Sequence, residues 1–176
     1  MMNFCSNCGQ PVMFGYIPEE DTERFHCTSC GAIHYENPKI VVGTLPRRDD
    51  KVLLCKRAIE PCKGLWTLPA GFMEMGETVE QGAIRETLEE ANAQVEIVRL
   101  FSIYSLPRIG QIYMIFLADL INLDFRPNKE TLEVKLFSKS QIPFGQIAFT
   151  AIRFALETYF HDSTQDSPYL GSNLKN

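Results

Sequence analysis

Residues 71–90 read Gly-Phe-Met-Glu-Met-Gly-Glu-Thr-Val-Glu-Gln-Gly-Ala-Ile-Arg-Glu-Thr-Leu-Glu-Glu, and the last five positions hold three carboxylates, Glu86, Glu89 and Glu90. On a helix, this i, i+3, i+4 spacing places the three side chains on one side. Because like charges at that spacing repel one another, we expect a cation among them. Clustered carboxylates suit a hard, oxygen-seeking ion such as Mg²⁺ or Mn²⁺. The alternative is an acidic helix face exposed to solvent.

The helix itself is predicted from the neighbouring residues. Thr78 suits the N-cap, and Gln81, three positions later, completes a capping box. Asn92 follows the glutamates and suits the left-handed position that ends a helix. Five further residues fall within an arc of roughly 140° and are expected to pack against the core: Ala83, Ile84, Thr87, Leu88 and Ala91.

The flanking residues extend this helix into a longer motif. Gly71, five residues, Glu77, seven residues and then Arg85-Glu86-x-x-Glu89-Glu90 resembles the signature of the Nudix hydrolases. The preceding Trp66-Thr-Leu-Pro-Ala-Gly71 also resembles that family. The resemblance implies an α/β fold in which a mixed sheet is sandwiched between helices.

The motif departs from the family pattern only at uncharged positions. The pattern has an aliphatic residue at Thr87, Gly at Asn92 and a larger aliphatic residue at Ala93. We expect Thr87 and Ala93 to be packing positions, while Asn92 can adopt the left-handed conformation.

The resemblance also implies the roles of the site residues. Glu86, Glu89 and Glu90 become ligands of Mg²⁺ or Mn²⁺, joined by the backbone carbonyl of Ala70. Glu77 and Arg85 become a structural ion pair that fixes the loop against the helix.

Gly82 and the general base are left open by the sequence. Gly82 could leave room for an ion or a phosphate, or allow a close contact between helix and strand. The general base stays open among Glu86, Glu90, Glu130 and Glu133. Glu130 and Glu133 are also candidates for substrate contacts, with a solvated strand edge as the alternative.

Arg57 and four aromatic residues complete the candidates for substrate contacts. Arg57 could reach a substrate phosphate or be an ordinary surface arginine. The aromatic residues could stack on a base or belong to the core: Trp66, Tyr104, Tyr113 and Phe116.

A second motif lies near the N-terminus. Cys5-x-x-Cys8 and Cys27-x-x-Cys30 are separated by eighteen residues, a spacing typical of a structural zinc site. Disulfides are the alternative, but we find no signal-peptide pattern, which favours thiolates and a cytoplasmic location. The resulting zinc ribbon would be structural, because four thiolates leave no open coordination position.

Charge and length bound the remaining possibilities. Residues 1–36 contain one basic residue, Arg24, against five acidic ones, and the whole chain has a formal charge of −5. Such a surface repels a phosphate backbone, so a nucleic-acid partner is not expected. No stretch approaches the roughly 20 apolar residues of a membrane helix. We expect a zinc ribbon at 1–36 acting as a lid, spacer or dimerisation element, a catalytic domain at 37–160 and a flexible tail at 161–176.

Within the catalytic domain, apolar patterning predicts strands and a second helix. The helix covers Ile147 to Tyr159, where apolar residues recur at helical spacing. The strands are predicted by their alternation and by the turn residues between them: 39–45, 52–56, 95–106, 111–120 and 132–137.

The motifs together predict a metal-dependent pyrophosphohydrolase. A diphosphate resists attack by water until its charge is neutralised and the nucleophile is oriented, which a divalent cation accomplishes. A zinc ribbon joined to such a domain resembles the NADH pyrophosphatases, although Ser102-Ile-Tyr-Ser-Leu-Pro-Arg-Ile-Gly110 lacks their Ser-Gln-Pro-Trp-Pro-Phe-Pro-x-Ser element. We therefore expect an adenine dinucleotide or ADP-sugar (FAD, ADP-ribose or NADH) cleaved to AMP and a phosphorylated product. The alternative functions are a non-catalytic sensor of such ligands and an RNA-cap hydrolase. For the assembly, the hypothesis is a homodimer.

Overall fold

The computed structural model describes residues 2–161 and 165–174. The chain forms two compact units, Met1–Asn37 and Pro38–Asn176. In the first unit, three short strands form an antiparallel sheet in the order β1-β2-β3. Their bounds are β1 Met13–Ile17, β2 Thr22–His26 and β3 Ile33–His34.

The second unit is built on one mixed sheet in the order β10-β5-β4-β9-β8-β11, with β6 paired to β5 and β7 paired to β4. The pairs β4–β9 and β8–β11 are parallel and the others are antiparallel. The strand bounds are β4 Lys39–Arg48, β5 Lys51–Arg57, β6 Trp66–Thr67, β7 Ala70–Phe72, β8 Val95–Leu106, β9 Gln111–Leu120, β10 Thr131–Ser138 and β11 Tyr169–Ser172. Short 3-10 turns lie at Pro107–Ile109, Lys139–Gln141 and Phe144–Gln146.

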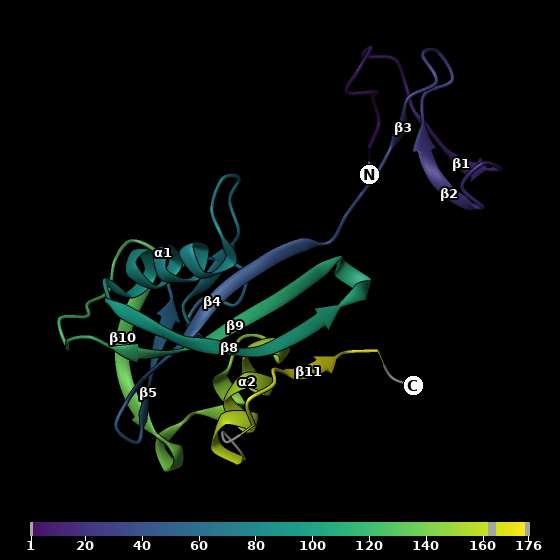
Figure 1. Cartoon of the computed structure of the whole chain (residues 1–176). Helices are drawn as coiled ribbons and strands as arrows, with labels where there is room; N and C mark the ends of the chain where they lie inside the picture. Colours follow the sequence, from purple (N-terminus) through teal and green to yellow (C-terminus); the bar gives the residue numbers. More distant parts are fainter. Residues whose placement is uncertain (1, 162–164, 175–176) are drawn as a thin grey trace. The chain divides into compact units, whose positions relative to one another are not determined.

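Two helices, α1 (Val79–Ala91) and α2 (Thr150–His161), cover opposite faces of this sheet (Figure 1). The larger core lies on the α2 face, where Ile152 and Leu156 pack fully buried among the strands. The predicted sandwich of a mixed sheet between helices is confirmed. No helix within the described residues is long and apolar enough to cross a membrane.

Helix α1 begins and ends as the sequence predicts. The Thr78 hydroxyl accepts a bond from the Gln81 N–H, and the Gln81 side chain accepts one from the Thr78 N–H. At the other end, Asn92 adopts a left-handed conformation with φ 50° and ψ 28°. Because both ends are fixed locally, the register of the glutamates on the helix follows from the sequence.

The buried face of α1 differs from the predicted arc. Ala83, Thr87 and Ala91 are buried as expected, but Ile84 is 38% exposed and Leu88 is 47% exposed. The helix is rotated so that the buried face extends toward the glutamates, with only 9% of Glu90 exposed. The prediction for Ile84 and Leu88 was wrong because periodicity alone ignores how closely the glycine face of the helix approaches the sheet.

The C-terminal residues also differ from the predicted flexible tail. Tyr169–Ser172 forms β11, which pairs in parallel with β8, and the Tyr169 ring lies 5.3 Å from the Phe101 ring between centroids. The Tyr104 ring leaves no space for a side chain at Gly171. These contacts order a stretch that has no strand pattern of its own. Of the predicted tail, residues 162–164 and 175–176 lie outside the described part of the chain.

Candidate functional site

The site is built where α1 lies against strand β4 and the loop that contains β7. A side chain at Gly82 would come within 2.8 Å of Val42 Cγ2 and 2.6 Å of Glu77 Oε1. Of the two uses considered for Gly82, the structure therefore shows the close contact between helix and strand. At Gly71 on β7, a Cβ atom would lie 2.4 Å from the Glu86 carboxylate. The two glycines let the backbone approach the helix and bring the glutamates against the loop.

Arg85 pairs with Glu77, as the family resemblance implies, and also contacts two of the three glutamates. Its Nε and Nη2 donate to Glu77 Oε2 and Oε1, both at 2.9 Å, which forms a bidentate ion pair. Its Nη1 donates to Glu86 at 2.7 Å and to Glu89 at 3.1 Å, and Nη2 also donates to the Phe72 carbonyl at 3.1 Å. All five N–H donors of the guanidinium are thus used. Arg85 fixes loop and helix to each other.

Each of the three glutamates keeps one carboxylate oxygen without a protein hydrogen bond among the described residues. Glu86 uses Oε1 and Glu89 uses Oε2 toward Arg85, while Glu90 Oε2 accepts the Ala70 N–H at 3.1 Å. The three remaining oxygens are hard donors of the kind that Mg²⁺ and Mn²⁺ prefer. The oxygens of the three carboxylates do not all lie within 4.8 Å of one another. Among the described residues, the one group of three or more metal-binding side chains that is this compact is formed by the four cysteines near the N-terminus. The residue types fit a divalent cation, which would contact a subset of the three as they stand.

Burial sets the proton affinity of these carboxyls. It raises the pKa of Glu90 from 4.5 to about 7, helped by the charges of Glu86 and Glu130 and opposed by the Ala70 N–H and the charge of Arg57. Burial also raises the pKa of Glu86. Desolvation thus favours the protonated form of both carboxyls, in Glu86 against the hydrogen bond and charge of Arg85.

Glu77 has the opposite environment. Hydrogen bonds from Arg85, and a further one from the Glu74 N–H, lower the pKa of Glu77 from 4.5 to about 2. Glu77 is thus a permanent anion paired with Arg85. Its role in the site is to hold the loop before α1 in place.

The predicted substrate contacts are brought together only in part. Arg57 ends β5, where its Nε donates to the Pro61 carbonyl at 2.8 Å and its guanidinium lies 5.1 Å from the centre of the Phe149 ring. The charge of Arg57 lowers the pKa of Glu90 and the charge of Glu130 raises it, so both residues lie within electrostatic range of that carboxyl. Glu133 pairs with Lys56 across the sheet, and it is not among the charges that perturb Glu86 or Glu90.

The four aromatic candidates belong to the core rather than to a stacking surface. Trp66, Tyr113 and Phe116 are at most 8% exposed, and Tyr104 packs against Phe154 with ring centroids 5.2 Å apart. Phe149, under Arg57, is the aromatic residue beside the site that the sequence did not single out. Its signal is weak because it lies between a 3-10 turn and α2, outside any periodic segment.

Two buried residues next to the glutamates were also missed. Cys55 is buried on β5, and burial together with the charge of Glu90 raises the pKa of its thiol. Thr44 is buried on β4, and its hydroxyl lies 2.6 Å from that of Thr87. No motif marks either residue, because the contacts depend on how α1 lies on the sheet.

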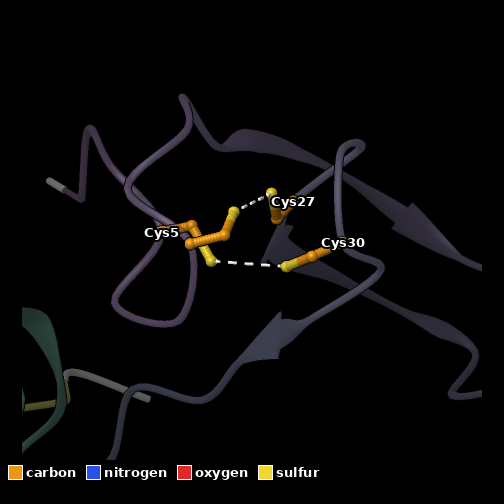
Figure 2. Close-up of side chains that lie close together, drawn as sticks. Cys5, Cys27 and Cys30 are labelled. Atoms are coloured by element: carbon orange, nitrogen blue, oxygen red, sulfur yellow. Dashed lines mark hydrogen bonds between the residues drawn. The ribbon is translucent and has the colours of Figure 1, made fainter.

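The N-terminal unit carries the predicted cysteine cluster. Figure 2 shows side chains of the cluster, among them Cys5, Cys27 and Cys30, with their sulfur atoms turned toward one another. The Sγ–Sγ distances are 3.7 Å for Cys5–Cys30 and 3.5 Å for Cys8–Cys27. These distances exclude disulfides, whose sulfurs are about 2.05 Å apart. Thiolates at ~2.3 Å from one tetrahedral zinc ion lie about 3.8 Å apart.

Comparisons with known proteins agree with both halves of this geometry. Residues 37–155 match the family model described as NUDIX domain, and residues 3–36 match a zinc-ribbon model described as Nudix N-terminal. The crystal structure of a NUDIX hydrolase from Nitrosomonas europaea is 53% identical, with a TM-score of 0.92 over 99% of this chain and 100% of that one.

Two curated relatives give more distant matches. An ADP-ribose pyrophosphatase from Methanocaldococcus jannaschii is 34% identical over 113 residues, which cover 62% of this chain and 67% of the relative. The NAD-capped RNA hydrolase NudC from Photobacterium profundum is 33% identical over 140 residues, which cover 78% of this chain and 50% of the relative. The chain thus spans about half the length of the NudC relative.

Proposed function

The chain belongs to the Nudix hydrolase family, and on that premise we propose that it cleaves the diphosphate of an adenine dinucleotide or ADP-sugar with a divalent cation held by carboxylates from the cluster of Glu86, Glu89 and Glu90. The observation that carries the proposal is that the partly buried Glu86 and the buried Glu90 lie against the loop at Ala70 and Gly71, each with one carboxylate oxygen that no described protein group hydrogen-bonds. Removing carboxylates from water costs free energy, which a bound divalent cation would offset.

The protein groups around the cation have separate tasks. A bound Mg²⁺ or Mn²⁺ would neutralise the diphosphate oxygens and orient the attacking water. Arg85 and Glu77 hold loop and helix together, so that the carboxylates keep their places as substrate arrives. Glu90 keeps one carboxylate oxygen that accepts no hydrogen bond from the described protein groups, and we assign this oxygen to accept the proton of the attacking water.

Arg57 supplies a second positive charge that acts on Glu90. Its single side-chain hydrogen bond, from Nε to Pro61, leaves the two terminal nitrogens without a partner among the described residues. A planar guanidinium with free N–H groups suits bidentate contact with a phosphate oxygen pair. We therefore assign Arg57 to the substrate diphosphate, with Glu130 as a neighbouring carboxylate of the site.

The choice of an adenine-containing substrate follows from the named relatives. One is an ADP-ribose pyrophosphatase and others are NAD-capped RNA hydrolases, so a diphosphate joined to adenosine is the part that their substrates share. An NAD-capped RNA is the second candidate, favoured by the NudC matches. The acidic N-terminal unit argues against it, because RNA binding draws on Lys and Arg.

The N-terminal cysteines complete the proposal. We assign a single structural zinc ion to Cys5, Cys8, Cys27 and Cys30, whose sulfurs all lie within 4.8 Å of one another. With four thiolate ligands this ion has no free position for substrate or water.

A substrate panel tests the proposed function. FAD, ADP-ribose, NADH, NAD-capped RNA and nucleoside triphosphates are incubated with the full chain and Mg²⁺ or Mn²⁺, and the products are separated chromatographically. AMP from a free dinucleotide or ADP-sugar is expected. Faster cleavage of capped RNA would establish the second candidate, and tight binding of ADP-ribose without any product would identify a sensor instead of an enzyme.

A further inference from the structure

A buried pair of hydroxyl groups joins Thr44 on β4 to Thr87 on α1, the residue that follows Glu86. Their oxygen atoms are 2.6 Å apart, and neither residue is exposed. Thr87 Oγ1 donates its only proton to the Ala83 carbonyl at 2.7 Å. Thr44 must therefore donate to Thr87, which makes a directed chain from strand to helix.

The pair is not explained by packing. Valine has the same shape as threonine, and the family pattern has an aliphatic residue at the position of Thr87. Replacing both partners of a buried hydrogen bond by apolar groups of the same shape is often neutral or even stabilising. The two buried hydroxyls therefore add little stability, and their hydrogen bond instead fixes how helix α1 is placed on strand β4.

The placement of α1 on β4 matters because Thr44 is also hydrogen-bonded to the loop of the site. Its backbone N–H donates to the Pro69 carbonyl at 3.1 Å, and the next residue, Ala70, donates its N–H to Glu90 at 3.1 Å. Thr44 thus holds the loop through its amide and the helix through its hydroxyl. Since Glu90 lies three residues after Thr87, the bonds close a ring that runs through strand, loop and helix.

The backbone of β4 also comes very close to the loop of the site, which limits how far the two can move relative to each other. A Cβ atom at Gly43 would lie 2.4 Å from the Pro69 carbonyl oxygen and 2.3 Å from Ala70 Cβ. Strand and loop are therefore in direct contact where Thr44 bonds to Pro69. A shift of α1 relative to β4 would therefore have to distort the hydroxyl pair or the Glu90 bond.

We propose that Thr44 and Thr87 are positioning residues that set the distance between the glutamates of α1 and the loop at Ala70, and thereby the affinity of the site for its divalent cation. This inference rests on the proposed function, because it takes Glu86 and Glu90 as cation ligands. Metal sites require their ligands to be held within about 0.5 Å, and residues behind the ligands change metal affinity by roughly 10–100-fold.

Variants of the two residues separate positioning from stability. Thr87→Val and Thr44→Val each remove one hydroxyl, Thr87→Ser keeps the hydroxyl and loses a methyl group, and Thr44→Val/Thr87→Val replaces the whole pair. The full-length proteins are titrated with Mn²⁺ alone, and free Mn²⁺ is read by electron paramagnetic resonance. Thermal unfolding is followed by the fluorescence of Trp66, the single tryptophan of the chain.

Both single valine variants are expected to weaken Mn²⁺ binding about tenfold and to lower Tm by several degrees. The double variant is expected to have a higher Tm than either single variant, because no buried hydroxyl is left without its partner, while its Mn²⁺ affinity stays low. Thr87→Ser is expected to have a lower Tm than the wild type, because a buried methyl group is lost, but a Mn²⁺ affinity within about twofold of the wild-type value. Ile152→Val, in the core under α2, is the control that lowers Tm without changing Mn²⁺ affinity.

The positioning role is overturned if a single valine variant binds Mn²⁺ like the wild type, or if the double variant regains full affinity. A wild-type protein that binds no Mn²⁺ would instead overturn the assignment of the cation, and the positioning role with it. The two failures are therefore distinguishable in the same titration.

Discussion

Glu90→Gln is expected to stabilise the magnesium-free protein while it disables the enzyme. Burial raises the pKa of Glu90 from 4.5 to about 7, so the folded protein holds this proton more tightly than the unfolded chain does. The stability linked to it is present below about pH 4.5 and is lost as the pH rises through about 7. Since one pKa unit corresponds to ~1.4 kcal/mol, ionised Glu90 destabilises the fold by about 3 kcal/mol at pH 8.

Glutamine removes this charge and can still accept the Ala70 N–H through its amide oxygen. Urea unfolding is measured through Trp66 fluorescence at pH 5 and at pH 8 in magnesium-free buffer. The stability gain of the variant should grow from small at pH 5 to about 3 kcal/mol at pH 8. Glu80→Gln, an exposed residue of the same helix, should change stability by less than about 0.5 kcal/mol at either pH.

Added Mg²⁺ should stabilise the wild type more than the variant, because ligand binding stabilises only the state that binds it. Equal stability of wild type and Glu90→Gln at pH 8, or the same gain at pH 5 and pH 8, would refute the reasoning. Either result would mean that ionisation of the Glu90 carboxylate does not destabilise the fold.

Three further predictions concern other parts of the molecule. Cys27→Ser should reduce bound zinc from about one ion per chain to nearly none, measured by elemental analysis; full zinc content in the variant would contradict the ligand set. Gly82→Ala should destabilise the fold by about 1–3 kcal/mol in urea unfolding, although Ala normally favours a helix, because the new methyl meets Val42. Gly145→Ala, with open space around it, is the control and should be nearly neutral. Arg57→Gln should raise KM about tenfold with little change in Mg²⁺ half-saturation; an unchanged KM would remove Arg57 from the substrate site.

The parts of the site that the sequence predicts are those fixed by local chemistry. The capping box at Thr78 and the left-handed Asn92 set the ends of α1, so the spacing of the carboxylates translates directly into their arrangement. The ion pair of Glu77 and Arg85 that the family resemblance implies is present, and Arg85 also contacts Glu86 and Glu89. The cysteine spacing likewise predicts the cluster near the N-terminus.

The remaining features depend on tertiary contacts that no local pattern records. Ile84 and Leu88 have the spacing of core residues, yet the close approach of Gly82 to β4 turns them toward solvent. Strand β11 pairs through its backbone at the edge of the sheet, so its short, partly polar sequence shows no strand alternation. Thr44 acquires its role only from the helix that lies across it.

The most direct test of the account is the Mg²⁺ dependence of AMP release by the wild type and by Glu89→Gln. Glu89 is chosen because its side chain is 58% exposed, so its replacement leaves the core untouched. The wild type should release AMP only with added Mg²⁺, and the variant, with unchanged Trp66 fluorescence, should turn over at least about a hundredfold more slowly at every Mg²⁺ concentration. Turnover of the folded variant near the wild-type rate, or AMP release by the wild type without a divalent cation, would contradict the proposal that these glutamates hold the catalytic metal.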